Sequence, residues 1–303
     1  MSRCSTQAAD GARSESWMFR AKEQLKQWLG TERTNAVRDW LEPLHLAALH
    51  ESIRNHGWDP ETLEMSDAQA AVHFADDVQM DLFGRTVTRF FHQYKLDFLR
   101  KHLSKEYISR STFLEVGDSD GLVLLGLGKT GFSINNDPRC IDLITQNGVE
   151  AHLGVGEKLD VADRSHDVAM AFETLEHSLH PVVFLEEMIR VARQKIILSV
   201  PGVTRTIIHP RVRGLRVGEE HVFEFCSRDL LRLATHLPLQ LTHFSKMSVF
   251  APPRNPLAWL LYKLHRTPQV FAGSFRSFDF YIFDIVHTDQ GVSVSESKDI
   301  YGE

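Results

Sequence analysis

From Thr112 onward, short apolar runs alternate with helical patterns, and this alternation limits the possible folds more than any other feature of the chain. Successive runs are separated by segments long enough for a crossover helix, which is the rhythm of β-α-β units and of a parallel sheet. The predicted strands of this series are 112–116, 131–134, 149–153, 167–172 and 195–200.

The segments between and after these strands complete the predicted architecture. Helices are predicted over 138–147, 181–191 and 227–236, where the last begins with Ser227 and Asp229, residues that suit a helix N-terminus. Two final strands are predicted over 239–250 and 276–287. The expected fold class is therefore α/β, a doubly wound and mostly parallel sheet.

The N-terminal third has a different texture. Residues 1–15 are small and polar and predict a disordered tail, whereas apolar residues recur at helical spacing over 16–105 and predict a helical extension. An aromatic stripe at Phe90, Phe91, Tyr94 and Phe98 is typical of a helix face that belongs to the core. The sheet domain is then expected over 106–303, with a Pro-rich, lid-like insertion at about 251–274.

Composition restricts the partners and the compartment. A net charge of -6 provides no global basic field, which disfavours nucleic acid as a partner without excluding it. Three widely spaced cysteines favour neither a disulfide framework nor a thiolate zinc site, so we expect a cytoplasmic protein. The sequence also predicts no secretory signal and no transmembrane segment, and it does not indicate an oligomeric state.

The first predicted strand runs into a glycine turn that could hold a nucleotide-like ligand. Glycine permits close backbone approach to a ligand, and neighbouring carboxylates accept hydrogen bonds from ribose or amino groups. A glycine turn alone is a weak signal, because such turns are common. The candidate cofactor residues in this turn are Glu115, Gly117, Asp118, Ser119 and Gly121.

The order of the segments makes the signal more specific. FLEVGDSDG, GFSINNDP, HLGVGEKLDVADRSHDVAMAFETLEH and FLEEMIRVARQKIILSVP follow one another as in the class I, Rossmann-like S-adenosylmethionine-dependent methyltransferases, which this chain resembles over about 112–250. The resemblance implies a glycine turn around the methionine part of the cofactor, a polar residue at the ribose, and an adenine site near the third and fourth strands. It adds Asn135, Asn136, Glu157 and Phe172 as cofactor candidates.

This sequence departs from the family pattern at two places in the cofactor site. Ser119 stands where the family has its middle glycine, which is tolerable only if its φ stays negative. Asn135 or Asn136 stands where an acidic residue is expected, so a ribose contact loses charge-assisted strength. A Rossmann-like domain that has lost its cofactor, serving as a binding or scaffold protein, is therefore one alternative.

A cluster of acidic and imidazole groups follows the fourth predicted strand. Glu173, Glu176 and His177 have spacings of three and four, which in a helical turn place them on one face. His221 lies further along, just before the predicted helix at 227–236. Converging carboxylates and imidazoles are suited to holding a divalent ion such as Mg²⁺ or Mn²⁺.

This E-x-x-E-H and later histidine pattern is similar to that of metal-dependent 2′-O-methyltransferases of RNA 3′ ends, and to ubiquinone-pathway O-methyltransferases. The first resemblance implies metal ligands at Glu173, Glu176, His177 and His221. The alternatives are general-base catalysis without metal, with Glu173, His177 and His221 as catalytic residues, and a purely structural role.

The resulting hypothesis is methyl transfer from S-adenosylmethionine to a hydroxyl of a small metabolite, sugar, lipid headgroup or glycan. The rivals are an RNA 2′-O-methyltransferase with a divalent metal and the cofactor-free binding protein. The arginine-rich segment 209–216 is interpreted either as a contact for a substrate phosphate or carboxylate, or as a solvated loop.

Overall fold

In the computed structural model the described residues are 43, 46–47, 49–72, 82–129, 131–203, 206–208, 221–247 and 277–286. The predicted tail at 1–15, the arginine-rich segment 209–216 and the predicted insertion at 251–274 lie outside these residues. None of the helices in the described ranges is long and apolar enough to cross a membrane.

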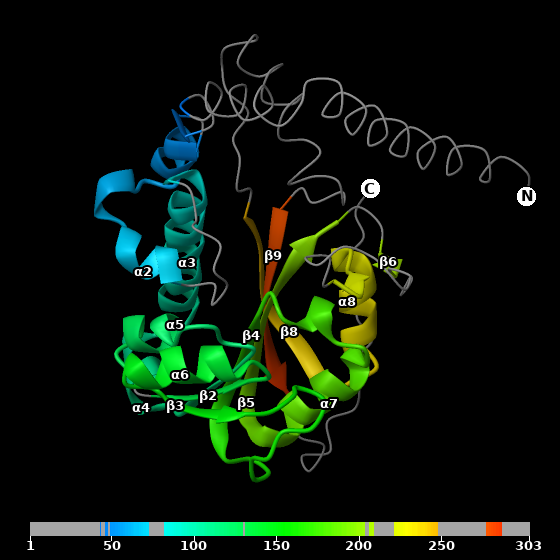
Figure 1. Cartoon of the computed structure of the whole chain (residues 1–303). Helices are drawn as coiled ribbons and strands as arrows, with labels where there is room; N and C mark the ends of the chain where they lie inside the picture. Colours follow the sequence, from blue (N-terminus) through cyan, green and yellow to red (C-terminus); the bar gives the residue numbers. More distant parts are fainter. Residues whose placement is uncertain are drawn as a thin grey trace, which may run out of the picture.

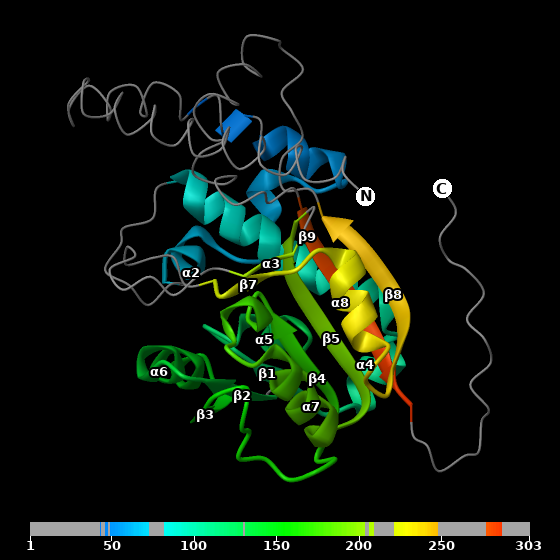
Figure 2. The ribbon, with the colours of Figure 1, turned by 90° about the vertical axis from the view of Figure 1, so that its right-hand side faces the viewer.

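A seven-stranded sheet forms the centre of the molecule, in the order β3-β2-β1-β4-β5-β9-β8. The first five strands pair in parallel, and β9 pairs antiparallel with both β5 and β8 (Figure 2). The predicted doubly wound, mostly parallel sheet is confirmed. Its strands are β1 (Phe113–Val116), β2 (Phe132–Asn135), β3 (Glu150–Leu153), β4 (His166–Phe172), β5 (Ala192–Gly202), β8 (Leu239–Met247) and β9 (Ser277–Ile285).

Helices cover both faces of this sheet (Figure 1). Successive strand residues alternate between two apolar cores, because side chains of a strand point alternately to opposite faces. Phe113 packs in one core and Leu114 in the other. The first core includes residues of α3 (Leu82–His102), α4 (Lys105–Arg110), α5 (Leu122–Gly126) and α6 (Pro138–Gln146), and the second includes residues of α7 (Pro181–Val191) and α8 (Ser227–Ala234).

The described part of the N-terminal region is helical, as its periodicity predicts. A helix ends at Asn55, and η1 (Pro60–Thr62), α2 (Asp67–Val72) and α3 follow. The aromatic stripe of α3 packs on β9: ring centroids are 4.4 Å apart for Phe91 and Phe278, and 4.9 Å apart for Tyr94 and Phe280. The stripe therefore belongs to the core of the sheet.

A small hairpin was not predicted. The two-residue strands β6 (Ile207–Ile208) and β7 (Phe223–Glu224) pair antiparallel, and both are too short to leave a periodic pattern in the sequence. The backbone N–H of Val222, just before β7, donates to the carbonyl of Glu176 at 2.8 Å. This bond fixes the chain around His221 against the loop that follows β4.

Candidate active site

The glycine turn after β1 requires glycine at its first position. Gly117 has φ +81°, and a Cβ added there would lie 2.2 Å from Cγ2 of Thr174. Thr174 cannot easily move away, because its hydroxyl donates to the carbonyl of Phe172 at 2.9 Å. The turn is thus packed closely against the loop that follows β4.

Asp118 holds the turn in shape. Its Oδ1 accepts from the backbone N–H groups of Asp120 and Gly121, and its Oδ2 accepts from the Ser133 hydroxyl at 2.6 Å. Burial raises the pKa of Asp118, and the charge of Asp120 adds to that effect. The carboxylate of Asp118 therefore stabilises the turn and connects it to β2.

Ser119 fits the turn without backbone strain. Among the described residues, the non-glycine residues with positive φ are Arg164 and Glu173, so Ser119 has the negative φ that a serine needs. Gly121, with φ +76°, supplies the other left-handed position. The departure from the family's glycine pattern therefore leaves the turn geometry intact.

The two asparagines after β2 have different environments. Asn135 is buried, donates through Nδ2 to the carbonyl of Asp118 at 2.6 Å, and accepts through Oδ1 from the Asp137 N–H at 2.8 Å. Asn136 is exposed. Asn135 thus connects β2 to the glycine turn, and Asn136 is the asparagine whose side chain is open to a ligand.

The remaining cofactor candidates lie on the loops and strand ends of the same edge. Glu157, after β3, accepts from the Ser178 hydroxyl at 2.6 Å. Phe172, the last residue of β4, is almost fully buried. Glu115, on β1, is buried, and its Oε2 has no hydrogen-bond partner within the described part of the chain. Burial first, and then the charge of Asp118, raises the pKa of Glu115 well above its usual value.

Glu173 lies apart from the other acid–imidazole residues. The turn η2 (Leu175–His177) begins only after it, and Glu173 itself has φ +47°, so the expected single helical face over 173–177 does not form. Its carboxylate instead contacts Lys95 on α3, with Nζ 3.0 Å from Oε2, and accepts from the Ser199 hydroxyl on β5. Glu173 therefore connects α3 to the carboxyl end of the sheet.

Glu176, His177 and His221 come together. One potential ligand atom from each lies within 4.8 Å of the others, and the two imidazole rings meet edge to face at 4.8 Å between centroids. Glu176 has no exposed surface, and neither of its carboxylate oxygens has a hydrogen-bond partner among the described residues. Burial first, and then the charge of Glu173, raises the pKa of Glu176 well above its usual value.

Sequence reasoning missed three residues of this region: Lys95, Thr174 and Ser199. Thr174 and Ser199 carry no pattern that distinguishes them from other strand and loop residues. Lys95 does leave a signal, because it follows Phe91 by four positions and so places a cation on the aromatic face of a helix. A lysine at such a position is buried only when it is paired.

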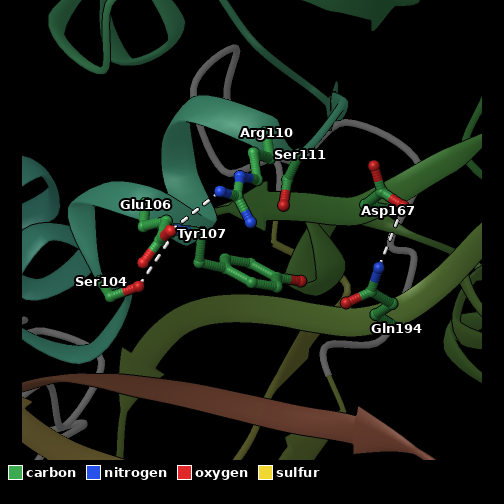
Figure 3. Close-up of a pocket in the computed structure, with 7 residues that line it drawn as sticks. All are labelled: Ser104, Glu106, Tyr107, Arg110, Ser111, Asp167 and Gln194. Carbon is green, nitrogen blue, oxygen red and sulfur yellow. Dashed lines mark hydrogen bonds and ion pairs between the residues drawn. The ribbon is translucent and has the colours of Figure 1, made fainter.

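An open pocket of about 370 Å³ lies at the opposite, amino-terminal edge of the sheet (Figure 3). Its polar groups largely bind one another: Arg110 pairs with Glu106 at 2.9 Å, and Gln194 donates to Asp167 at 3.1 Å. Ligands of doubly wound sheets bind at the carboxyl ends of the strands, so this pocket is remote from the candidate site. Its lining residues are Ser104, Glu106, Tyr107, Arg110, Ser111, Asp167 and Gln194.

One family model matches part of this chain. Residues 101–225 match the family described as methionine biosynthesis protein MetW. No curated protein matches the sequence of this chain. The matched segment runs from the end of α3 to just before α8, and it contains the glycine turn, Glu173, Glu176, His177 and His221.

Several solved methyltransferases are similar in structure. One from Thermotoga maritima is 14% identical, with a TM-score of 0.45, and the match covers 64% of this chain and 89% of that chain. One from Methanosarcina mazei is 13% identical, with a TM-score of 0.44, covering 62% and 97%. The magnesium protoporphyrin IX methyltransferase of Synechocystis, with bound S-adenosylhomocysteine, is 10% identical, with a TM-score of 0.46, covering 69% and 90%.

The parallel strands run in the order 3-2-1-4-5, with a glycine turn after the first. The expected Rossmann-like, doubly wound fold is thereby confirmed, and the segment that matches the MetW family contains all five parallel strands.

Proposed function

We propose that the protein transfers a methyl group from S-adenosylmethionine to a hydroxyl of a small metabolite, sugar, lipid headgroup or glycan. The observation that carries the proposal is the cluster of Glu176 and His177, in the loop that follows β4 and packs on the glycine turn, with His221, which lies just before β7. Such a cluster can receive the proton of a hydroxyl at the place where this fold holds its cofactor.

The cofactor site is proposed at the carboxyl ends of β1, β2 and β4. The turn from Gly117 to Gly121 would hold the methionine part through its backbone, Asn136 would contact the ribose, and Phe172 and Glu157 would border the remainder. The left-handed glycines, the negative φ of Ser119 and the exposure of Asn136 support this assignment. Holding the donor and the acceptor in line supplies several kcal/mol of the catalytic effect.

The proton of the acceptor can be handled in two ways. Without a metal, His177 or His221 serves as the general base, a role that typically contributes about 10²- to 10⁴-fold. With a metal, Glu176, His177 and His221 would hold a divalent cation, whose chemistry there would be to lower the pKa of the acceptor hydroxyl. The fully buried Glu176 carboxylate, whose oxygens lack hydrogen-bond partners among the described residues, fits a cation, and two imidazoles with one carboxylate suit Mn²⁺ better than Mg²⁺.

The first test is calorimetric titration of the protein with S-adenosylmethionine and with S-adenosylhomocysteine. We expect both to bind, and to bind Asn136→Ala more weakly than the wild type. Asp142→Ala, which removes another polar side chain from the α6 region, is the matched control. Folded protein that binds neither compound would overturn the methyltransferase proposal and favour a binding protein on the same fold.

The second test distinguishes base from metal. S-adenosylmethionine with a labelled methyl group is incubated with pools of sugars, lipids and small alcohols, with and without EDTA. The label transferred to the acceptors is measured for the wild type, Glu176→Gln and His221→Ala. Mn²⁺ is also titrated while the melting temperature is followed, since a cation that binds the native state alone adds about 2.7 kcal/mol at 100 times its Kd. Transfer that persists in EDTA, with no shift in melting temperature, would remove the metal.

An RNA acceptor is the second candidate, because the metal-dependent RNA methyltransferases that the sequence resembles use the same kinds of ligand. The net charge of -6 argues against it. Including an RNA oligonucleotide with a free 3′ end in the label-transfer assay tests it directly: label in the oligonucleotide alone would replace the small-molecule acceptor by RNA.

A further inference from the structure

Lys95 brings a charged group from the N-terminal helix to the edge of the sheet where the cofactor is proposed. It lies in the middle of α3, before the segment 101–225 that matches the MetW family. Its residue surface is 8% exposed. Its Nζ lies 3.0 Å from Oε2 of Glu173, and 4.7 and 5.2 Å from the ring centroids of Phe91 and Phe172.

The surroundings keep this ammonium charged although it is buried. Burial alone lowers the pKa of a lysine, but here acidic neighbours, and Glu173 first among them, outweigh burial and raise the pKa of Lys95. The acids around Lys95 are Glu173 on the loop after β4, Glu115 on β1 and Asp120 in the glycine turn. Lys95 therefore places a positive charge where the glycine turn and the loop after β4 meet.

The acidic residues around Lys95 differ in the hydrogen bonds that they already accept. Asp120 accepts from the Leu122 N–H at 2.9 Å and is engaged in the turn. Glu173 is held by the Ser199 hydroxyl and holds Lys95 in turn. An ammonium has three N–H donors and no acceptor, so a lysine fixed by one carboxylate has donors that can serve a second one.

We propose that Lys95 binds the α-carboxylate of the methionine end of the cofactor, with Glu173 as the positioning residue that aims the ammonium. This inference rests on the proposed function. The methionine end carries one carboxylate and one ammonium, and the Lys95–Glu173 pair offers one group of each sign beside the glycine turn. The N-terminal extension thereby forms part of the cofactor site.

The test compares two ligands that differ only at the proposed contact region. S-adenosylhomocysteine has the amino-acid end, whereas 5′-methylthioadenosine keeps the adenosine and the thioether and lacks that end. Both are titrated calorimetrically into wild type and Lys95→Met. We expect Lys95→Met to weaken S-adenosylhomocysteine about 10- to 100-fold, the range for a lost charge-assisted hydrogen bond, and to leave 5′-methylthioadenosine within about twofold.

Two further variants serve as controls for this comparison. Lys101→Met removes an exposed lysine from the same helix and should change neither affinity. Lys95→Met leaves Glu173 without its cation and can destabilise the fold, so the double variant Lys95→Met/Glu173→Gln removes the pair together. We expect the double variant, checked by thermal melting, to show the same selective loss of S-adenosylhomocysteine.

The outcomes separate this inference from the proposed function. If the wild type binds S-adenosylhomocysteine and the Lys95 variants lose both ligands equally, or lose neither, Lys95 is a structural counter-ion of Glu173 and the assignment is overturned while the cofactor proposal stands. If the folded wild type binds neither ligand, both fall together. Selective loss of S-adenosylhomocysteine alone supports the assignment.

Discussion

Glu115 and Glu176 lie towards the carboxyl ends of the parallel strands, and Asp167 lies near their amino ends. The carboxylates at these two places differ in the hydrogen-bond donors that surround them. At the carboxyl edge, burial is the main cause that raises the pKa values of Glu115 and Glu176, and oxygens of both lack hydrogen-bond partners among the described residues. At the amino-terminal edge, burial also acts on Asp167, but hydrogen bonds from Arg193 and Thr112 outweigh it and lower the pKa of Asp167 to about 2. Glu115 and Glu176 are thus short of hydrogen-bond donors, although Asp118 at the same edge accepts from three, whereas Asp167 is surrounded by donors.

This difference shows where the fold gains stability from an acidic side chain. Asp167 accepts from the Thr112 N–H and hydroxyl at 2.8 and 2.9 Å and from Arg193 Nε at 2.9 Å, and so joins β4, the start of β1 and β5. A group that is fully bonded within the protein has little left for a ligand. The buried acids of the carboxyl edge are costly for stability, which is common at functional sites.

The largest predicted effect is that of Gly117→Ala at the carboxyl edge, compared with Gly128→Ala after α5. Both glycines have positive φ, +81° and +71°, but an added Cβ meets Thr174 at Gly117 and nothing within 4 Å at Gly128. We expect Gly128→Ala to lower the free energy of unfolding by about 1–2 kcal/mol, the cost of the left-handed backbone. Gly117→Ala should lose roughly a further 1–3 kcal/mol from the overlap with Thr174. Urea denaturation measures both, and equal losses would contradict the close packing of the turn on the loop.

Asp167→Asn should lower the free energy of unfolding by about 2 kcal/mol at pH 7, from the drop in its pKa to about 2. Because the folded-state pKa lies below the unfolded one, the contribution is present above about pH 4 and is lost as the pH falls towards 2. Urea denaturation at pH 7 and pH 3 should therefore show the difference between wild type and variant shrinking at the lower pH. A difference independent of pH would mean that the ion pair with Arg193 is not its source.

Glu115→Gln should have the smallest effect, and the opposite sign. The folded-state pKa of Glu115 is raised, so the wild type loses stability as the pH rises above the unfolded value of about 4.3, and the neutral amide avoids that loss. We expect the free energy of unfolding at pH 7 to be unchanged or higher than that of the wild type. The exposed Glu186→Gln on α7 is the control. A clear destabilisation by Glu115→Gln alone would show that this carboxylate is ionised and engaged by Lys95.

Sequence patterns were sufficient for the seven strands of the sheet and for α6, α7 and α8, because burial on two faces leaves apolar runs of strand length and helices leave a period of 3.6. The order of these elements along the chain then indicated that the glycine turn is a candidate cofactor site. The structure then separated residues that the sequence could only group: Asn135 connects β2 to the turn, whereas Asn136 is exposed.

Sequence spacing was misleading at Glu173. Spacings of three and four predict a shared face only within a continuous helix, and the left-handed backbone at Glu173 removes it from the turn that carries Glu176 and His177. The contact between Glu173 and Lys95 depends on how α3 docks on the sheet, which no local pattern records. The predicted metal and catalytic roles of these residues remain predictions, to be decided by the titrations above.

The position of β9 has a consequence for synthesis of the protein. Residues 277–285 insert between β5 and β8, and the aromatic face of α3 packs on Phe278 and Phe280 of the same strand. A nascent chain that has not yet reached residue 277 therefore leaves one edge of β5 unpaired, β8 without a strand partner, and Phe91 and Tyr94 of α3 without their contacts to β9. On the ribosome, we expect these segments to depend on chaperones until β9 emerges and pairs with them.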